Sequence, residues 1–172
     1  MLLKLSGKAS VWAKARFREK VFMNDRLRDI LAADIFIDTN ILFYGINIGN
    51  PEKYARAGAL LEYLWQKEPL PSISTQVLQE FYVTLIRHRV EADEAQKIVK
   101  DYFVWNVIPA GIKLIEEAFQ VQRRYALSFW DSLIIAAAQR SQSEYLLTED
   151  LNHGQKYGRL VVINPFHPDF AG

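Results

Sequence analysis

The chain contains no cysteine among its 172 residues. This absence excludes structural disulfide bonds, thiolate metal sites and cysteine nucleophiles, and it agrees with a reducing compartment. Any metal ion must therefore bind to oxygen or histidine ligands. The chain also lacks the roughly eighteen uninterrupted apolar residues that a membrane span needs, and its first residues lack the apolar block of a secretion signal. These absences predict a cytoplasmic protein without a membrane segment.

Apolar residues are plentiful enough for one sizeable core, since 50% of the chain is hydrophobic and 13% is aromatic. A chain of this length is short for two such cores. The formal net charge of +1 is distributed unevenly. Residues 1–33 contain eight Lys or Arg and three acidic residues, a net charge of +5, which leaves −4 for the remainder. We therefore expect a basic extension over 1–33, helical or partly disordered, followed by one globular domain over 34–172.

The basic extension has three interpretations. Its spaced apolar residues predict one or two amphipathic helices, which would be an appendage or upstream sequence translated from an early start. It could instead be a cationic arm that holds nucleic acid through phosphate contacts. A mitochondrial presequence is the third interpretation of such a basic segment.

Short apolar runs alternate with longer helical patterns beyond residue 34. The runs that predict strands are 35–37, 72–74, 107–108, 145–148 and 160–163. The helical patterns cover 51–65, a stripe from Val77 to Leu85, 92–102, 113–124 and an apolar segment opened by Ser128. Buried strands separated by helices predict an α/β fold with three layers, in which helices flank a mostly parallel central sheet.

Four acidic residues fall where such a sheet brings strand ends and helix starts together. In open parallel sheets, a site forms outside the carboxyl ends of the strands. Asp38 closes the first strand, and Asp150 lies two residues past Thr148 at the end of another. Glu80 lies about two turns into the helix after the second strand, and Asp131 lies in the first turn of the helix opened by Ser128. We expect these four carboxylates to converge.

Each acid also has a structural alternative. Asp38 or Asp150 could be a helix cap or a turn residue, and Ser128 and Asp131 have the spacing of a capping box. Asp131, however, faces an apolar turn, and Glu80 borders an apolar stripe. No Lys or Arg lies nearby in the sequence to neutralise either charge, so both need another partner.

Four converging carboxylates repel one another unless protons or cations neutralise them. An anionic site made only of oxygen ligands suits Mg²⁺ or Mn²⁺ that retains several waters. Zinc is not expected, because His88, His153 and His167 do not form an H-x-x-x-H pair, and we interpret them as capping, surface or packing residues. A hydrated cation lowers the pKa of bound water and offsets charge on an attacked phosphate. The predicted chemistry is phosphodiester hydrolysis.

The order of these residues resembles the PIN domain, and the compact single-domain form resembles the VapC-type toxin ribonucleases. The resemblance spans residues 34–166. The segments that carry it are 37–42, 79–81, 128–134 and 147–151, with the tail from Leu151 to Phe166. Residues 1–33 depart from the family pattern, in which the chain begins close to the first strand.

The resemblance implies an endonuclease that cleaves structured RNA, such as tRNA or rRNA, with water as the nucleophile. The site residues it implies are Mg²⁺ or Mn²⁺ ligands at Asp38, Glu80, Asp131 and Asp150, with supporting hydrogen bonds from Thr39 or Asn40 and from Thr148. It further implies a homodimer and a cognate antitoxin protein that covers the acidic pocket.

RNA is a polyanion, so basic and aromatic side chains must help the metal to bind it. The basic candidates for the rim of the site are Arg87, Arg89, Arg123, Arg124, Lys156 and Arg159, which are otherwise ordinary surface charges. Tyr44 or Trp130 could stack on unpaired bases, although we expect core packing for both.

Three other functions stay open. One is a housekeeping RNA-processing nuclease of the PIN superfamily. Another is a haloacid dehalogenase-like phosphatase with Asp38 as covalent nucleophile, but such enzymes carry a second acid where this chain has Asn40. The third is a non-catalytic PIN-like binding module, against which the retention of all four acids argues.

Overall fold

A six-stranded sheet forms the centre of the computed structural model, which describes residues 24–170. Its strand order is β3-β2-β1-β4-β6-β5. The strands are β1 (Ile35–Ile37), β2 (Ser72–Ser74), β3 (Asn106–Ile108), β4 (Tyr145–Leu147), β5 (Lys156–Tyr157) and β6 (Leu160–Ile163). All neighbouring strands are parallel except β5 and β6, which are antiparallel. The mostly parallel sheet is confirmed, and β5 is the strand that the sequence pattern did not predict.

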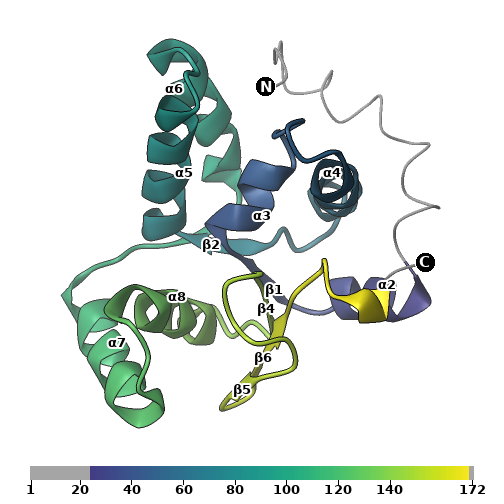
Figure 1. The fold of residues 1–172 in the computed structure, drawn as a ribbon. Coiled ribbons are helices and arrows are strands. Elements are labelled where there is room, and N and C mark those ends of the chain that lie inside the picture. Colours follow the sequence, from purple (N-terminus) through teal and green to yellow (C-terminus); the bar gives the residue numbers. More distant parts are fainter. Residues whose placement is uncertain (1–23, 171–172) are drawn as a thin grey trace.

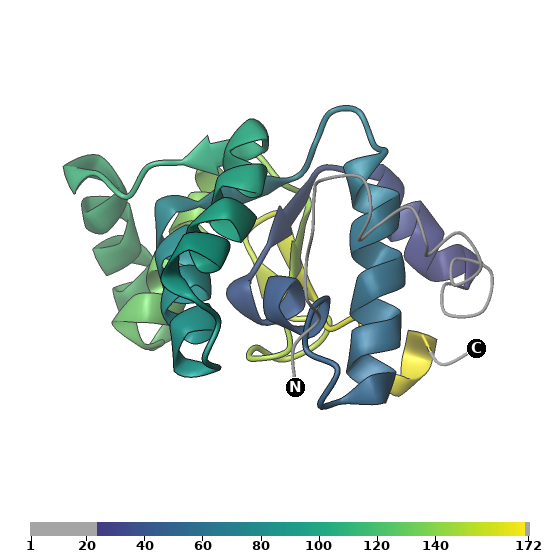
Figure 2. The same ribbon diagram turned by 90° about the horizontal axis from the view of Figure 1, so that it is seen from above.

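Helices cover both faces of this sheet. They are α2 (Asp25–Ala32), α3 (Thr39–Tyr44), α4 (Pro51–Trp65), α5 (Thr75–Arg87), α6 (Ala92–Asp101), α7 (Ile112–Tyr125) and α8 (Phe129–Arg140), with 3₁₀ helices η1 (Tyr102–Val104) and η2 (Pro168–Phe170). In the view of Figure 2, α2 and α4 lie on one side of the strands and α5 to α8 lie on the other. The predicted three-layer α/β architecture is therefore confirmed. No helix within residues 24–170 is both long and apolar enough to cross a membrane.

Side-chain caps fix where the helices begin. The Asn50 side chain accepts a hydrogen bond from the backbone of Lys53 ahead of Pro51, and the Ser74 side chain accepts one from Val77. These caps satisfy backbone N–H groups that have no partner inside the helix. Because Ser74 is also the last residue of β2, α5 starts directly at the carboxyl edge of the sheet.

Helix α2 brings the end of the basic extension into the domain. Leu27 and Leu31 are fully buried in the common core, and the Asn24 side chain donates to the backbone oxygen of Asp169. Arg26 forms an ion pair with Asp169 at 3.5 Å. These two contacts bring α2 and η2 together, and in Figure 1 the yellow η2 lies next to α2. The predicted helices and cationic arm before residue 24 lie outside the described residues, and the division at residue 33 stays a prediction.

Candidate metal centre

Asp38 lies between β1 and α3, at the carboxyl edge of the sheet. One carboxylate oxygen accepts a hydrogen bond from the backbone N–H of Thr39 at 2.7 Å, which caps α3. The other accepts one from the Thr148 hydroxyl at 2.6 Å. Thr148 reaches it because β1 and β4 are parallel neighbours, with Ile37 opposite Leu147. Asp38 is therefore both the N-cap of α3 and a residue at the carboxyl ends of the strands, as the sequence predicted.

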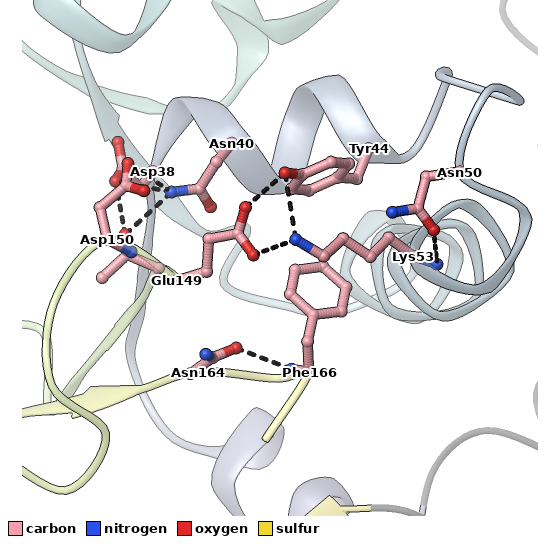
Figure 3. Close-up of polar contacts among 10 residues, drawn as sticks. Asp38, Asn40, Tyr44, Asn50, Lys53, Glu149, Asp150, Asn164 and Phe166 are labelled. Atoms are coloured by element: carbon pink, nitrogen blue, oxygen red, sulfur yellow. Dashed lines mark hydrogen bonds and ion pairs between the residues drawn. The ribbon is translucent and has the colours of Figure 1, made fainter. Parts of the chain in front are cut away.

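Asn40 joins Asp150 to this pair. Its side-chain Nδ2 lies 3.2 Å from Asp38 Oδ2, 3.0 Å from Thr148 Oγ1 and 3.1 Å from Asp150 Oδ2 (Figure 3). The backbone N–H of Asp150 also donates to Thr148 Oγ1 at 3.1 Å. The residues after β1 and the residues after β4 are therefore held together by one amide and one hydroxyl.

Glu80 approaches the same place from α5. Its Oε2 accepts a hydrogen bond from the Thr39 hydroxyl at 3.0 Å, and its Oε1 accepts one from the Gln76 side chain at 2.8 Å. Gln76 is buried and was not among the predicted site residues. Its spacing of four residues from Glu80 on one helix face was the signal available in the sequence.

The charges of these acids are reflected in the pKa of Asp38. Burial of its carboxyl group raises this pKa to about 6, hydrogen bonds from Thr148 and Thr39 oppose the shift, and the charges of Asp150 and Glu80 add to it. All hydrogen bonds from described residues to the three carboxylates come from neutral donors. No described Lys, Arg or His forms an ion pair with any of them. The cluster therefore keeps an excess of negative charge.

Asp131 lies in the first turn of α8, where it forms the capping arrangement that the sequence offered as its structural alternative. Its backbone N–H donates to the Ser128 hydroxyl oxygen at 3.1 Å, and that hydroxyl lies 2.7 Å from Asp131 Oδ2. No hydrogen bond among the described residues joins Asp131 to the other three acids. Asp131 is linked to Glu80 only indirectly among the described residues. Gln76 Nε2 lies 2.8 Å from Glu80 Oε1 and 3.5 Å from the backbone oxygen of Trp130, the residue before Asp131.

A cavity of about 670 Å³ opens beside the acids. Asn40, Glu80 and Asp150 contribute to its wall, as do Arg87 from α5 and Trp130 from α8. The side chain of Trp130 is 61% exposed, so the expected core packing was wrong for this residue. Tyr44 also lines the cavity and is half-buried. The cavity thus combines carboxylates, a guanidinium group and an accessible aromatic ring.

The donor set fits a hard divalent cation. Its carboxylates are anionic oxygen ligands, and two buried amide oxygens, Asn40 Oδ1 and Gln76 Oε1, have no hydrogen-bond partner among the described groups. Asn40 turns its Nδ2, and not Oδ1, toward Asp38 and Asp150, so the fit rests on the carboxylates, whose charge a hydrated cation would balance. Asp38, Glu80 and Asp150 are the described side chains that could hold such a cation, with water ligands across the wider gaps.

The histidines take other positions. His153 Nδ1 accepts a hydrogen bond from the backbone N–H of Asn164 at 3.2 Å, and its ring stacks on His167 at 4.3 Å. Both rings lie near Asp169. These three residues form the one described group of three or more His, Cys, Asp or Glu whose ligand atoms lie within 4.8 Å of one another. The acids of the candidate metal centre are more widely spaced, as a largely hydrated Mg²⁺ allows.

Fold and site together define a class: a three-layer α/β domain with a carboxylate cluster at the carboxyl edge of a mostly parallel sheet. The family model described as the PIN domain matches residues 35–158, which include all four predicted acids. The chain belongs to the PIN domain family, and the resemblance noted in the sequence is confirmed.

Solved structures show the same fold. A toxin-antitoxin complex from Klebsiella pneumoniae aligns with a TM-score of 0.57 at 20% identity, covering 77% of this chain and 98% of the matched chain. VapC20 from Mycobacterium tuberculosis, a sarcin-ricin loop cleaving toxin, aligns with a TM-score of 0.50 at 24% identity, covering 66% of this chain and 87% of its own. A comparison with curated protein sequences found no match.

Proposed function

We propose that this protein is a metal-dependent endoribonuclease, the toxin of a type II toxin-antitoxin pair, which hydrolyses phosphodiester bonds in structured RNA in the cytoplasm. The observation that carries the proposal is the joint placement of Asp38, Glu80 and Asp150 around Thr39 and Asn40. No described Lys, Arg or His forms an ion pair with these three acids. PIN membership and the toxin structures with the same fold support it.

The ligands of the proposed Mg²⁺ or Mn²⁺ are Asp38, Glu80 and Asp150. Asp131 joins them if its carboxylate turns from the Ser128 cap toward the cavity. The bound cation would supply an acidified water and would offset the charge on the attacked phosphate. The chain's own contribution is orientation: Thr148 and Asn40 hold the Asp38 carboxylate, while Thr39 and Gln76 hold Glu80.

RNA recognition is assigned to the side chains around the cavity. Arg87 and Trp130 both line it, from α5 and α8. In the proposed complex Arg87 contacts a phosphate, and an unpaired base stacks on the exposed Trp130 ring. The other basic candidates, all exposed, are Arg89, Arg123, Arg124, Lys156 and Arg159.

The proposed partners are the RNA substrate, an antitoxin protein and a second copy of the chain. A toxin-antitoxin complex with the same fold supports the antitoxin. An antitoxin that covers the cavity would block RNA from the carboxylates, so the same surface would serve substrate and inhibitor. The homodimer follows from the family resemblance.

A cleavage assay on purified protein tests the proposal. Wild-type protein is incubated with structured tRNA and rRNA fragments, with Mg²⁺ or Mn²⁺ and with chelator. We expect cleavage that needs the metal and is lost in Asp38→Asn, because this variant removes a charged ligand from a buried position. Circular dichroism checks that the variant is folded. Full activity of Asp38→Asn, or undiminished cleavage after rigorous metal removal, would contradict the proposal.

A further inference from the structure

A second polar network lies directly beside the candidate metal centre (Figure 3). It joins α3, α4 and the segment after β4. The Lys53 ammonium group forms an ion pair with one carboxylate oxygen of Glu149, and the Tyr44 hydroxyl donates a hydrogen bond to the other. Lys53 Nζ also donates to the Tyr44 hydroxyl oxygen at 3.2 Å. Three side chains from three segments thus form a closed set of contacts.

Aromatic rings shield this network from water. Lys53 Nζ lies 4.4 Å from the centre of the Tyr44 ring and 5.3 Å from that of Phe166, and these two rings meet edge to face at 5.4 Å. The side chains of Lys53 and Glu149 are only 28% and 18% exposed. A cation held between aromatic faces and paired with a shielded carboxylate is more strongly attracted than one in an exposed surface ion pair.

The network is connected to the candidate metal centre through two pairs of residues. Asn40 and Tyr44 lie one turn apart on α3, so their side chains project from one face of this helix. Asn40 contacts Asp150, and Tyr44 contacts Glu149, the residue just before Asp150. Helix α3 therefore forms hydrogen bonds with two successive residues after β4: Asp150 in the carboxylate cluster and Glu149 in the network with Lys53.

We propose that Lys53, Tyr44 and Glu149 are positioning residues, which hold the segment after β4 against α3 and keep the Asp150 carboxylate turned toward Asp38 and Asn40. The inference rests on the proposed function in one respect, because it treats Asp150 as a metal ligand. It also means that the Lys53 charge is engaged with Glu149 and does not serve as an RNA-phosphate contact. In this role Lys53 and Glu149 act through Asp150 and do not themselves bind the metal.

Calorimetric titration of the full chain with Mn²⁺, in the absence of RNA, tests this inference. Lys53→Met and Glu149→Gln should each weaken Mn²⁺ binding by about tenfold or more, the usual loss when a group that orients a metal ligand is removed. Lys53→Arg should bind Mn²⁺ as the wild type does, because it keeps a cation between the two rings. The matched controls are Lys97→Met and Glu116→Gln, which make the same changes at exposed positions of α6 and α7.

The double variant Lys53→Met/Glu149→Gln separates positioning from simple charge neutralisation. If the two residues act as one unit, the double variant binds Mn²⁺ as weakly as either single variant. Wild-type affinity in the double variant would mean that Lys53 only cancels the Glu149 charge, and it would overturn the positioning role.

Amide hydrogen exchange of the metal-free protein provides a readout that does not depend on the metal. We expect the backbone amides of 148–151 to exchange faster in Lys53→Met and Glu149→Gln than in the wild type or the two controls. Unchanged exchange together with unchanged Mn²⁺ affinity would refute the inference. If the wild type itself binds no Mn²⁺ while exchange still rises in the variants, the proposed function fails and the positioning role stands.

Discussion

At the scale of single residues, Asp38 combines two roles that the sequence could only offer as alternatives. It caps α3 through Thr39 and it faces Thr148, Asn40 and the charges of Glu80 and Asp150. The short run of apolar residues before it was enough to predict its place at a strand end. Burial raises its pKa to about 6, and Thr148 and Asp150, which also affect this pKa, lie more than a hundred positions away, where no local pattern reveals them.

This raised pKa predicts how metal binding depends on pH. The Asp38 carboxyl must lose its proton to become a metal ligand, and its pKa of about 6 means that protons compete with the metal below that pH. The dissociation constant for Mn²⁺ should therefore rise by up to about tenfold for each pH unit below 6 and should level off above it. Calorimetry between pH 5 and 7.5 measures this. A dissociation constant that is constant over this interval would rule out a titrating ligand.

The exposed Trp130 ring predicts a second residue-scale effect. Trp130→Ala should weaken binding of single-stranded RNA by about tenfold or more, because it removes a stacking surface, while Trp130→Phe should retain most of the affinity. Asp38→Asn can serve as the cleavage-deficient background for fluorescence anisotropy. Phe103→Ala is the matched control, since Phe103 is 58% exposed on η1 and does not line the cavity. Equal affinities for Trp130→Ala and Phe103→Ala would remove Trp130 from the RNA site.

At the scale of elements, the sequence predicted long helices and apolar strands well and short or irregular segments poorly. Helices such as α4 and α5, with 15 and 13 residues, repeat their apolar spacing over several turns, so the sequence pattern predicts their positions. Strand β5 has two residues and, among the described strands, pairs with β6 alone, which is too little for a sequence pattern. The network of Lys53 with Glu149 was also beyond prediction, because it depends on how α4 is placed against the segment after β4.

Helix α2 supplies an element-scale prediction. Leu27 is fully buried, so Leu27→Ala should lower the free energy of unfolding by about 2–5 kcal/mol, as large-to-small changes in a packed core do. Ile86→Ala is the control, because the Ile86 side chain is 40% exposed on α5. This variant should lower the free energy of unfolding much less than Leu27→Ala does. Urea denaturation of both variants provides the measurement. A negligible loss in Leu27→Ala would show that α2 does not contribute to the stability of the domain.

At the scale of the whole molecule, the charge distribution poses a problem that the proposed function must solve. The acids at the sheet edge repel RNA, whereas residues 1–33 carry a net charge of +5. We predict that deleting residues 1–22, which leaves α2 intact, lowers RNA affinity more at low salt than at high salt, because phosphate contacts release counterions. Filter binding from 50 to 300 mM salt measures the slope. An identical slope with and without these residues would exclude an electrostatic role for them.

Anomalous diffraction from crystals soaked in Mn²⁺ would locate the divalent cation that we propose Asp38, Glu80 and Asp150 bind together. We expect a strong peak among these three carboxylates, beside Asn40 and Thr148. A peak only at His153, His167 and Asp169, or none near the carboxylates at a saturating Mn²⁺ concentration, would contradict it.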